Sequence, residues 1–380
     1  MRHPSFLGYR PAVIRVFKCG WAYDRRVPRR AVGGQVLRRV GAICASASDH
    51  RLLRHEVLAQ VRRRVPFDAH MWLMTDPETS VGSAPLADVP SLSELPTLIG
   101  LKYRTRVNRW TLLEAGRVRT LLGATSRDPS RSPLWRDLLA AHDVVDVAST
   151  VFRDRYGCWG FLDLWRVSPG LPFEQDDVRF LGELGATVTA ALRHVQAATF
   201  SMSGRVGALP AGPVVLLLSP NLEVRAQTPQ AERYLKRLVP PREGARAVPA
   251  AAYNVAAQLR AVEAGVDGNP PRARVHLGDD VWLTLRAARI PYEHQGTEPD
   301  IAVTLELASP ADRLDLFARC FVLSPRETQL VHQLATGTDT RRTAHLLALS
   351  ESTVQDHLKA VFAKTSVHSR AELLARALGA

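Results

Sequence analysis

Hydrophobic residues recur every three or four positions near the end of the chain, with polar residues between them. In residues 348–366, ALSESTVQDHLKAVFAKTS, a helix turning about 100° per residue gathers one apolar stripe from Val354, Leu358, Val361 and Phe362. The opposite side carries only short, polar or flexible side chains, namely Ser352, Asp356, Lys359, Ala360 and Ala363. This nearly flat face could approach a DNA groove about 12 Å wide, but the solvated face of an ordinary amphipathic helix has the same pattern.

Capping signals divide the surrounding residues into short helices. Ser324 is followed by Pro325 and Glu327, which is the pattern of a capping box with proline at the first helical position. That helix should end at Gly337. A second helix fits residues 340–348, Ser350 can cap the third, and Ser369 with Glu372 opens a fourth. We therefore predict an all-α four-helix domain over residues 323–380, whose second and third helices form a helix-turn-helix.

These residues resemble a known family. The runs LSPRETQL, LATG and ALSESTVQDHLKAVFAKTSVHSRAEL are similar to the C-terminal DNA-binding domain of LuxR-type bacterial transcriptional regulators. The resemblance implies that the helix at about 351–364 enters the major groove of double-stranded DNA. It also implies a set of DNA-contacting residues: Thr340, Arg341, Ser352, Thr353, Gln355, Asp356, Lys359, Lys364 and Arg370.

Three residues depart from the family pattern. Thr343 stands where an aliphatic residue is usual, and Ala348 and Ser366 stand where glycine is frequent. If Ala348 or Ser366 must adopt a left-handed conformation, we expect each to cost about 1 kcal/mol.

Asp356 is an acidic residue on a face that is expected to meet DNA. Phosphates would repel its carboxylate, but at the groove floor the carboxylate could accept a hydrogen bond from cytosine N4. Alternatively, Asp356 pairs with Lys359 or Arg341 and contacts no base. The sequence leaves both interpretations open.

The residues before this domain predict two α+β units. In the first unit, residues 34–65 are predicted to form two helices, followed by a strand at 69–76 and a loop at 77–96. A helix that extends to Trp110 then precedes three strands, at 118–124, 144–154 and 158–167, and a long helix at 173–198. The run GCWGFLDLWRVSPGLPFEQDDVRFLGEL resembles the end of a GAF domain, which implies a GAF-like sensor domain at 34–199. The long helix repeats apolar residues in steps of three and four, an apolar seam that fits either packing on its own sheet or pairing of two chains: Leu181, Leu184, Val188, Ala191 and Val195.

A linker at 200–212 precedes the second unit. Two strands, helices and then three strands over residues 213–308 resemble a PAS fold. Ser309 and Pro310 begin a connector helix at 309–322. The resemblances together imply a multidomain actinobacterial regulator of LuxR type with GAF-like and PAS-like sensor domains.

Composition and charge restrict the remaining choices. The net charge of +13 is concentrated in residues 1–64, which carry +12, whereas residues 320–380 carry only +2, so the pattern and not the charge indicates DNA binding. Residues 1–33 form a basic extension that we expect to be disordered, to contact phosphates or to precede the natural start. The cysteines Cys19, Cys44, Cys158 and Cys320 lack metal-ligand or disulfide spacing.

The sequence indicates a DNA-binding regulator, not an enzyme. The segment HEVLA at residues 55–59 lacks the second histidine of a zinc-protease helix, and the glycine-rich nucleotide motifs do not occur. With no apolar run of membrane-spanning length and no signal core, we expect a cytoplasmic protein without metal or cofactor, binding DNA as a homodimer and sensing an unknown ligand. The alternatives are a ligand-sensing or protein-interaction module whose helix-turn-helix does not read DNA, and a GAF-type enzyme such as a sulfoxide reductase.

Overall fold

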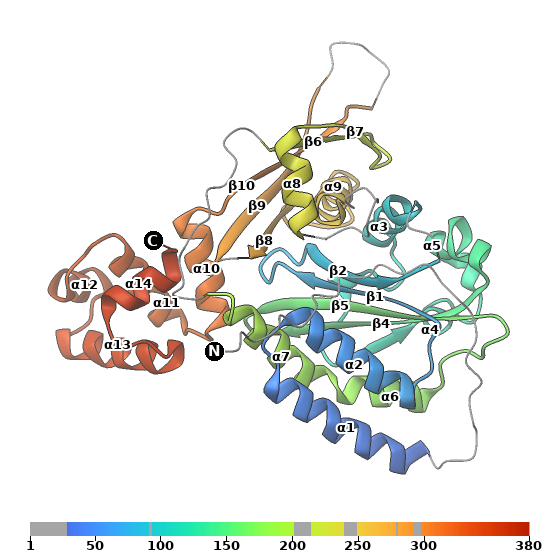
Figure 1. Cartoon of the computed structure of the whole chain (residues 1–380), viewed down its shortest axis with the longest axis horizontal. Coiled ribbons are helices and arrows are strands. Elements are labelled where there is room, and N and C mark those ends of the chain that lie inside the picture. The colour runs from blue at the N-terminus through green and yellow to red at the C-terminus, as the bar shows by residue number, and fades with distance from the viewer. Residues whose placement is uncertain are drawn as a thin grey trace, which may run out of the picture.

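Two antiparallel sheets with their helices are followed by a helical bundle (Figure 1). The computed structural model describes residues 29–90, 93–200, 214–238, 249–278, 280–291 and 298–379. Most of the predicted basic extension therefore lies outside the described residues. Residues 29–33 are an exception, because they already belong to the first helix.

The first sheet has the strand order β2-β1-β5-β4-β3. Its strands are β1 Ala69–Thr75, β2 Gly82–Asp88, β3 Val118–Thr120, β4 Val144–Asp154 and β5 Gly157–Val167. One face is covered by α1 Arg29–Ser46, α2 His50–Arg64, α6 Gln175–Glu183 and α7 Gly185–Ala197 (Figure 1). The helices α3 Leu95–Arg104, α4 Leu121–Ala124 and α5 Pro133–Asp137 lie along the other face and end, with 3-10 turns at Trp110–Leu112, Pro129–Arg131 and Leu139–His142.

Strand β1 shows why this sheet separates two cores. Its side chains alternate between faces, so Met71 and Leu73 join the core under α3, whereas Trp72 and Met74 join the core under α2 and α7. Both faces are buried, which explains the almost unbroken apolar run AHMWLMT.

The second sheet has the order β7-β6-β10-β9-β8. Its elements are β6 Val215–Leu218, β7 Val224–Gln227, α8 Pro229–Leu238, α9 Ala250–Glu263, β8 Arg272–Gly278, β9 Val281–Arg289 and β10 Ile301–Leu307. Helix α9 lies between the two units and contacts α3 and β2 on one side and β9 on the other (Figure 1). Its sequence AAAYNVAAQL is small and buried nearly all round, which permits this close approach from both sides. A Cβ atom on Gly82 of β2 would lie 2.6 Å from Asn254 Oδ1.

The C-terminal bundle is joined to the sheets by α10 Pro310–Cys320, which packs against α7, α11 and α14. The bundle consists of α11 Pro325–Ala335, α12 Thr340–Leu347, α13 Glu351–Thr365 and α14 Arg370–Leu378. These helices agree with the capping signals, because each signal acts within a few residues of the helix end that it defines.

Three sequence-based expectations for the sheet units were wrong. Strand β2 lies within the predicted loop 77–96. The predicted strand 118–124 becomes helical after Thr120, whose side chain caps α4 by accepting a hydrogen bond from Gly123 N at 3.0 Å. The predicted long helix 173–198 is interrupted between α6 and α7. Phe200, assigned to the linker, is completely buried, and residues 201–213 lie outside the described part.

Candidate nucleic-acid interface

Side-chain caps define the ends of the helix-turn-helix. Ser324 accepts a hydrogen bond from Glu327 N at 3.2 Å while Glu327 Oε2 accepts one from Ser324 N at 2.6 Å, which completes the predicted capping box. Asp339 accepts from Arg342 N at 2.7 Å to begin α12, and Ser350 accepts from Thr353 N at 3.1 Å to begin α13. These bonds satisfy backbone N–H groups that have no partner within their own helix, and so set where each helix starts.

The outward face of α13 is the one that the sequence predicted. Val354, Leu358 and Val361 are buried against the other helices of the bundle. On the opposite face Ser352, Asp356, Lys359 and Ala363 are exposed and Ala360 is half-buried, and Gln355 on its flank is exposed. No other element of the described chain covers this face, so α13 can approach a groove without rearrangement of the bundle.

Asp356 and Lys359 form an ion pair on this face. Lys359 Nζ lies 3.2 Å from Asp356 Oδ1, and the two side chains are 77 % and 73 % exposed. An exposed pair one helical turn apart contributes less than about 1 kcal/mol. Asp356 can therefore exchange Lys359 for another partner at little cost.

Two predicted DNA-contacting cations hold the bundle together in this structure. Lys364 Nζ lies 2.6 Å from Glu327 Oε2, joining the end of α13 to the start of α11. Arg370 donates to the carbonyl of Thr338. Glu327 is buried, and burial alone would raise its pKa, but the hydrogen bond and charge of Lys364 and the amide of Ser324 hold the pKa below its usual value. Both cations therefore have a structural role, which the sequence did not indicate.

The remaining predicted residues lie around the start of the two helices. Thr340 is half-buried at the first position of α12, Arg341 is exposed beside it, and Thr353 is half-buried, with its hydroxyl 2.8 Å from that of Ser350. Arg342 is also exposed on α12 and was absent from the predicted set. Two consecutive arginines shortly after the capping residue Asp339 could have indicated that Arg342, like Arg341, is exposed at the start of α12.

The three family departures have clear structural consequences. Ala348 has φ 51° and Ser366 has φ 53°, so both residues adopt the left-handed conformation at the ends of α12 and α13. Thr343 is completely buried, with its hydroxyl 3.0 Å from that of Thr338, which accounts for a polar residue at an aliphatic position.

An aromatic and arginine cluster attaches the bundle to the sheet units. The ring of Phe200 stacks on Trp282 with centroids 5.5 Å apart and meets Phe317 of α10 edge-on at 5.4 Å. Arg376 of α14 donates from Nε to the carbonyl of Phe200 at 2.6 Å. Arg313 of α10 lies 3.0 Å from Asp280 Oδ1, with side-chain exposures of 6 % and 4 %. Burial raises the pKa of Asp280 despite this cationic partner.

Asp163 binds two buried side chains of the first unit. Lys102 Nζ lies 2.9 Å from Asp163 Oδ2, and Trp110 Nε1 donates to Asp163 Oδ1 at 3.0 Å. Cys158 is buried and burial raises its pKa, so its thiol stays protonated and unreactive at neutral pH. The described residues include no group of three or more His, Cys, Asp or Glu side chains placed to bind a metal.

The apolar seam on the long helix serves the fold of a single chain. Leu181, Leu184, Val188, Ala191 and Val195 are all buried within the protein. The pattern is therefore explained by packing on the first sheet and α1, and it is not available for pairing two chains. Within the described part of the chain, every helix is too short or too polar to cross a bilayer.

Comparison with known proteins identifies the class of the C-terminal module. Residues 321–377 match the family model of bacterial regulatory proteins of the luxR family. The C-terminal region is therefore a LuxR-type helix-turn-helix domain, the class to which its geometry points. A match to a family of regulators agrees with the expectation that the chain is not an enzyme. No curated protein is significantly similar to the chain.

Two solved structures have weak overall similarity. A crystal structure of Escherichia coli SdiA is 13 % identical, covers 91 % of this chain and 98 % of that one, and has a TM-score of 0.32. A structure of SdiA in complex with octanoyl-rac-glycerol is 12 % identical, covers 93 % and 88 %, and has a TM-score of 0.27. Similarity this low defines neither the sensor fold nor a ligand for this chain.

Proposed function

We propose that the protein is a sequence-specific, DNA-binding transcriptional regulator that places α13 in the major groove. The observation that carries this proposal is the exposed, nearly flat face of α13 in a domain of LuxR type. Ser352, Gln355 and Asp356 would reach base edges from this face, since short polar side chains can read bases in the major groove. Recognition from this face requires no unfolding of the bundle.

Residues around α13 complete the proposed interface. Thr340, Arg341, Thr353 and Lys359 would contact the phosphate backbone, which positions a protein on the duplex without reading sequence. Lys364 and Arg370 each use only some of their N–H groups within the bundle, so the remaining donors can contact phosphates. Because the domain carries little net charge, the number of phosphates that it neutralises should be small.

The two sheet units would regulate this activity. Their α+β architecture and antiparallel sheets are compatible with GAF-like and PAS-like sensor domains. We propose a cytoplasmic regulator that acts as a homodimer, because a pair of helix-turn-helix domains matches the two-fold symmetry of most operators. The alternative is a sensing or interaction module whose helix-turn-helix no longer reads DNA, which the small charge of the domain would favour.

Selection of DNA by the full chain tests the proposal. The protein is incubated with a pool of random duplexes, bound duplexes are amplified over several rounds, and the affinity for the enriched sequence is measured between 50 and 200 mM salt, a range over which phosphate contacts weaken binding. We expect one enriched motif with two half-sites and an affinity that falls with salt by the slope of a few phosphate contacts per half-site.

Gln355→Ala is the matched variant, and Gln35→Ala on the exposed surface of α1 is its control. Loss of discrimination in the first variant alone supports reading by α13. Equal binding of enriched and scrambled duplexes by the unmodified chain would instead establish the interaction-module alternative.

A further inference from the structure

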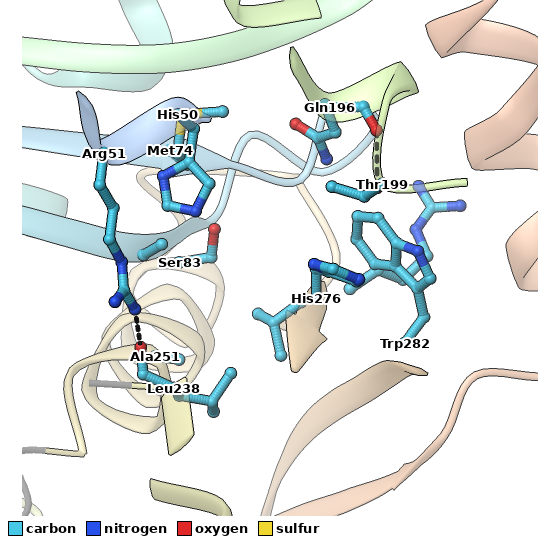
Figure 2. A pocket seen from close by; sticks show the side chains of 13 residues that line it. His50, Arg51, Met74, Ser83, Gln196, Thr199, Leu238, Ala251, His276 and Trp282 are labelled. Atoms are coloured by element: carbon cyan, nitrogen blue, oxygen red, sulfur yellow. Dashed lines mark hydrogen bonds between the residues drawn. The ribbon is translucent and has the colours of Figure 1, made fainter. Parts of the chain in front are cut away.

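A cavity of about 60 Å³ lies at the boundary between the two sheet units. It is lined by side chains from α2, β1 and β2, from the end of α7, and from α8, α9, β8 and β9 (Figure 2). A single water needs roughly 10–15 Å³ of such space. The cavity is therefore large enough for a molecule of several non-hydrogen atoms.

One buried acceptor in this cavity has no partner. Gln196 is 8 % exposed, and its Oε1 accepts no hydrogen bond from any residue that the structure describes. Figure 2 shows its side chain extending from α7 into the space between His50 and His276. A buried carbonyl without a donor is unfavourable, so this position favours a ligand with an N–H or O–H group.

His50 supplies the complementary donor. Its Nδ1 lies 2.9 Å from Arg54 Nη2, and because a guanidinium only donates, Nδ1 must accept. Burial and the nearby charges of Arg54 and Arg51 hold the pKa of His50 well below its usual value, so the ring is neutral. The proton therefore resides on Nε2, which can donate to a ligand carbonyl.

The rest of the lining is mainly apolar. Met74, Ala84, Ala251 and Val275 contribute hydrocarbon surface, which gives water few partners. Two cations line the cavity: Arg274 is bound to Asp76 and Glu78, and Arg51 donates from Nη2 to the carbonyl of Leu238 at 2.8 Å. The lining therefore fits a small uncharged molecule with a short hydrocarbon body.

The cavity is joined directly to the attachment of the DNA-binding module. Thr199 and Trp282 line it. Thr199 precedes Phe200, whose ring stacks on Trp282 and whose carbonyl accepts from Arg376 of α14. An occupant that contacts Thr199 and Trp282 thus touches both groups that position Phe200.

We propose that this cavity binds a small uncharged molecule carrying one N–H or O–H donor and one carbonyl acceptor, and that binding tightens the attachment of α14. The regulatory consequence rests on the proposed DNA-binding function, but the binding and the tightening do not. The donor pairs with Gln196 Oε1 and the carbonyl with His50 Nε2. Filling the cavity fixes Trp282 and Phe200, and through Phe200 the position of Arg376.

The test uses 2-pyrrolidinone, a five-membered ring with both groups, and cyclopentanone, the same ring without the N–H. Binding to the full chain is measured by ligand-detected saturation-transfer NMR. We expect 2-pyrrolidinone to bind about fivefold more tightly, the effect of one hydrogen bond. Equal affinities, or no saturable binding of either ring, would overturn the site.

Variants locate the binding. Gln196→Met keeps the length of the side chain and removes the amide, so it should abolish the preference for 2-pyrrolidinone. Ala251→Leu fills the cavity and should abolish binding of both rings. Gln35→Met, on the exposed face of α1, is the control and should bind as the unmodified chain does. A preference that survives Gln196→Met places the ring elsewhere and overturns the proposal.

Hydrogen exchange of the backbone amides in α14 tests, without DNA, whether binding of the ligand tightens the attachment of α14. Saturating 2-pyrrolidinone should slow that exchange severalfold in the unmodified chain and leave it unchanged in Gln196→Met. Binding without any change in α14 exchange would overturn the coupling. Failure of DNA selection would overturn the proposed function while leaving these two results in place.

Discussion

Arg274 of β8 forms a buried ion pair with Asp76, the residue after β1, at the boundary between the two sheet units. Arg274 Nε donates to Asp76 Oδ2 and Nη2 donates to Oδ1, each at 2.8 Å, and the side chains are 1 % and 0 % exposed. Arg274 Nη1 also donates to the carbonyl of Asp312 in α10 at 3.0 Å. Burial alone would raise the pKa of Asp76, but the bonds and charge of Arg274 hold it below its usual value. One guanidinium therefore joins both sheet units to the connector helix.

Asp76→Asn should strongly destabilise the chain. The substitution removes the buried anion of the Arg274 guanidinium and leaves only the partly exposed Glu78, and breaking such a buried pair typically costs about 3–5 kcal/mol. The measurement is urea unfolding followed by circular dichroism. Glu78→Gln is the matched control, because Glu78 bonds to the same guanidinium from a side chain that is 34 % exposed. That control should cost less than about 1 kcal/mol. Equal shifts of the two midpoints would mean that burial of this pair does not determine its contribution.

Asp356→Ala should change which base is preferred at one operator position. A carboxylate that accepts from cytosine discriminates by about 1–3 kcal/mol, so the variant should bind substituted operators almost equally at that position. Competition between operator variants measures this. A uniform rise in affinity for all DNA, with unchanged preferences, would show that Asp356 only repels phosphates.

Lys364→Met and Lys359→Met should have separable effects. Lys364 is bound to the buried Glu327, so its replacement should lower stability by about 1–2 kcal/mol. Lys359 is 77 % exposed and its ion pair contributes little, so its replacement should leave stability nearly unchanged. The same replacement should reduce the salt dependence of DNA binding by the amount that corresponds to about one phosphate contact. Unfolding and salt titrations measure both effects. Two variants of equal stability would rule out the structural role of Lys364.

The contribution of Glu327 should depend on pH. Because its pKa is lowered in the folded chain, the ionised carboxylate stabilises the fold above its ordinary pKa, and this stabilisation is lost as pH falls through the lowered value. Glu327→Gln should therefore be about 1–2 kcal/mol less stable than the unmodified chain at pH 7. The difference should shrink from about pH 5 downward. A difference that is constant from pH 7 to pH 3 would contradict this assignment.

Ala348→Gly and Ser366→Gly should each stabilise the bundle. Both residues adopt the left-handed backbone conformation, which is unfavourable for a residue with a Cβ atom. Glycine should therefore raise the free energy of unfolding by about 0.5–1 kcal/mol, after its greater freedom in the unfolded chain is counted. Ala360→Gly, within α13, is the control and should lose about 1 kcal/mol. Thermal melting of the three variants provides the ranking, and destabilisation by Ala348→Gly would show that this conformation carries no strain.

The short helices of the C-terminal domain could be predicted because their signals are local. A cap such as Ser350 bonds within three residues, and the stripe through Val354 and Leu358 repeats every turn, so both can be read from neighbouring letters. The flat face of α13 follows from the same periodicity. The resemblance to the LuxR type marked Ala348 and Ser366 as positions where glycine is frequent, and both adopt the left-handed conformation, although Ala348 was expected to belong to the second helix.

Features that depend on distant segments could not be read in this way. The sequence of strand β2, GSAPLAD, shows neither alternation of apolar and polar residues nor β-branched residues, and it becomes a strand by pairing with β1. Phe200 attaches the bundle only because the fold brings Trp282 and Arg376 into contact with it. Lys364 resembled a free cation until Glu327, 37 residues earlier, came within 2.6 Å. Local hydrogen bonding and periodicity thus determined the helices and the candidate DNA face. The tertiary structure decided three features: the ion pair of Arg274 with Asp76, the cavity beside Gln196 and the attachment of the bundle. The reason is that burial removes charges from water and brings remote residues together.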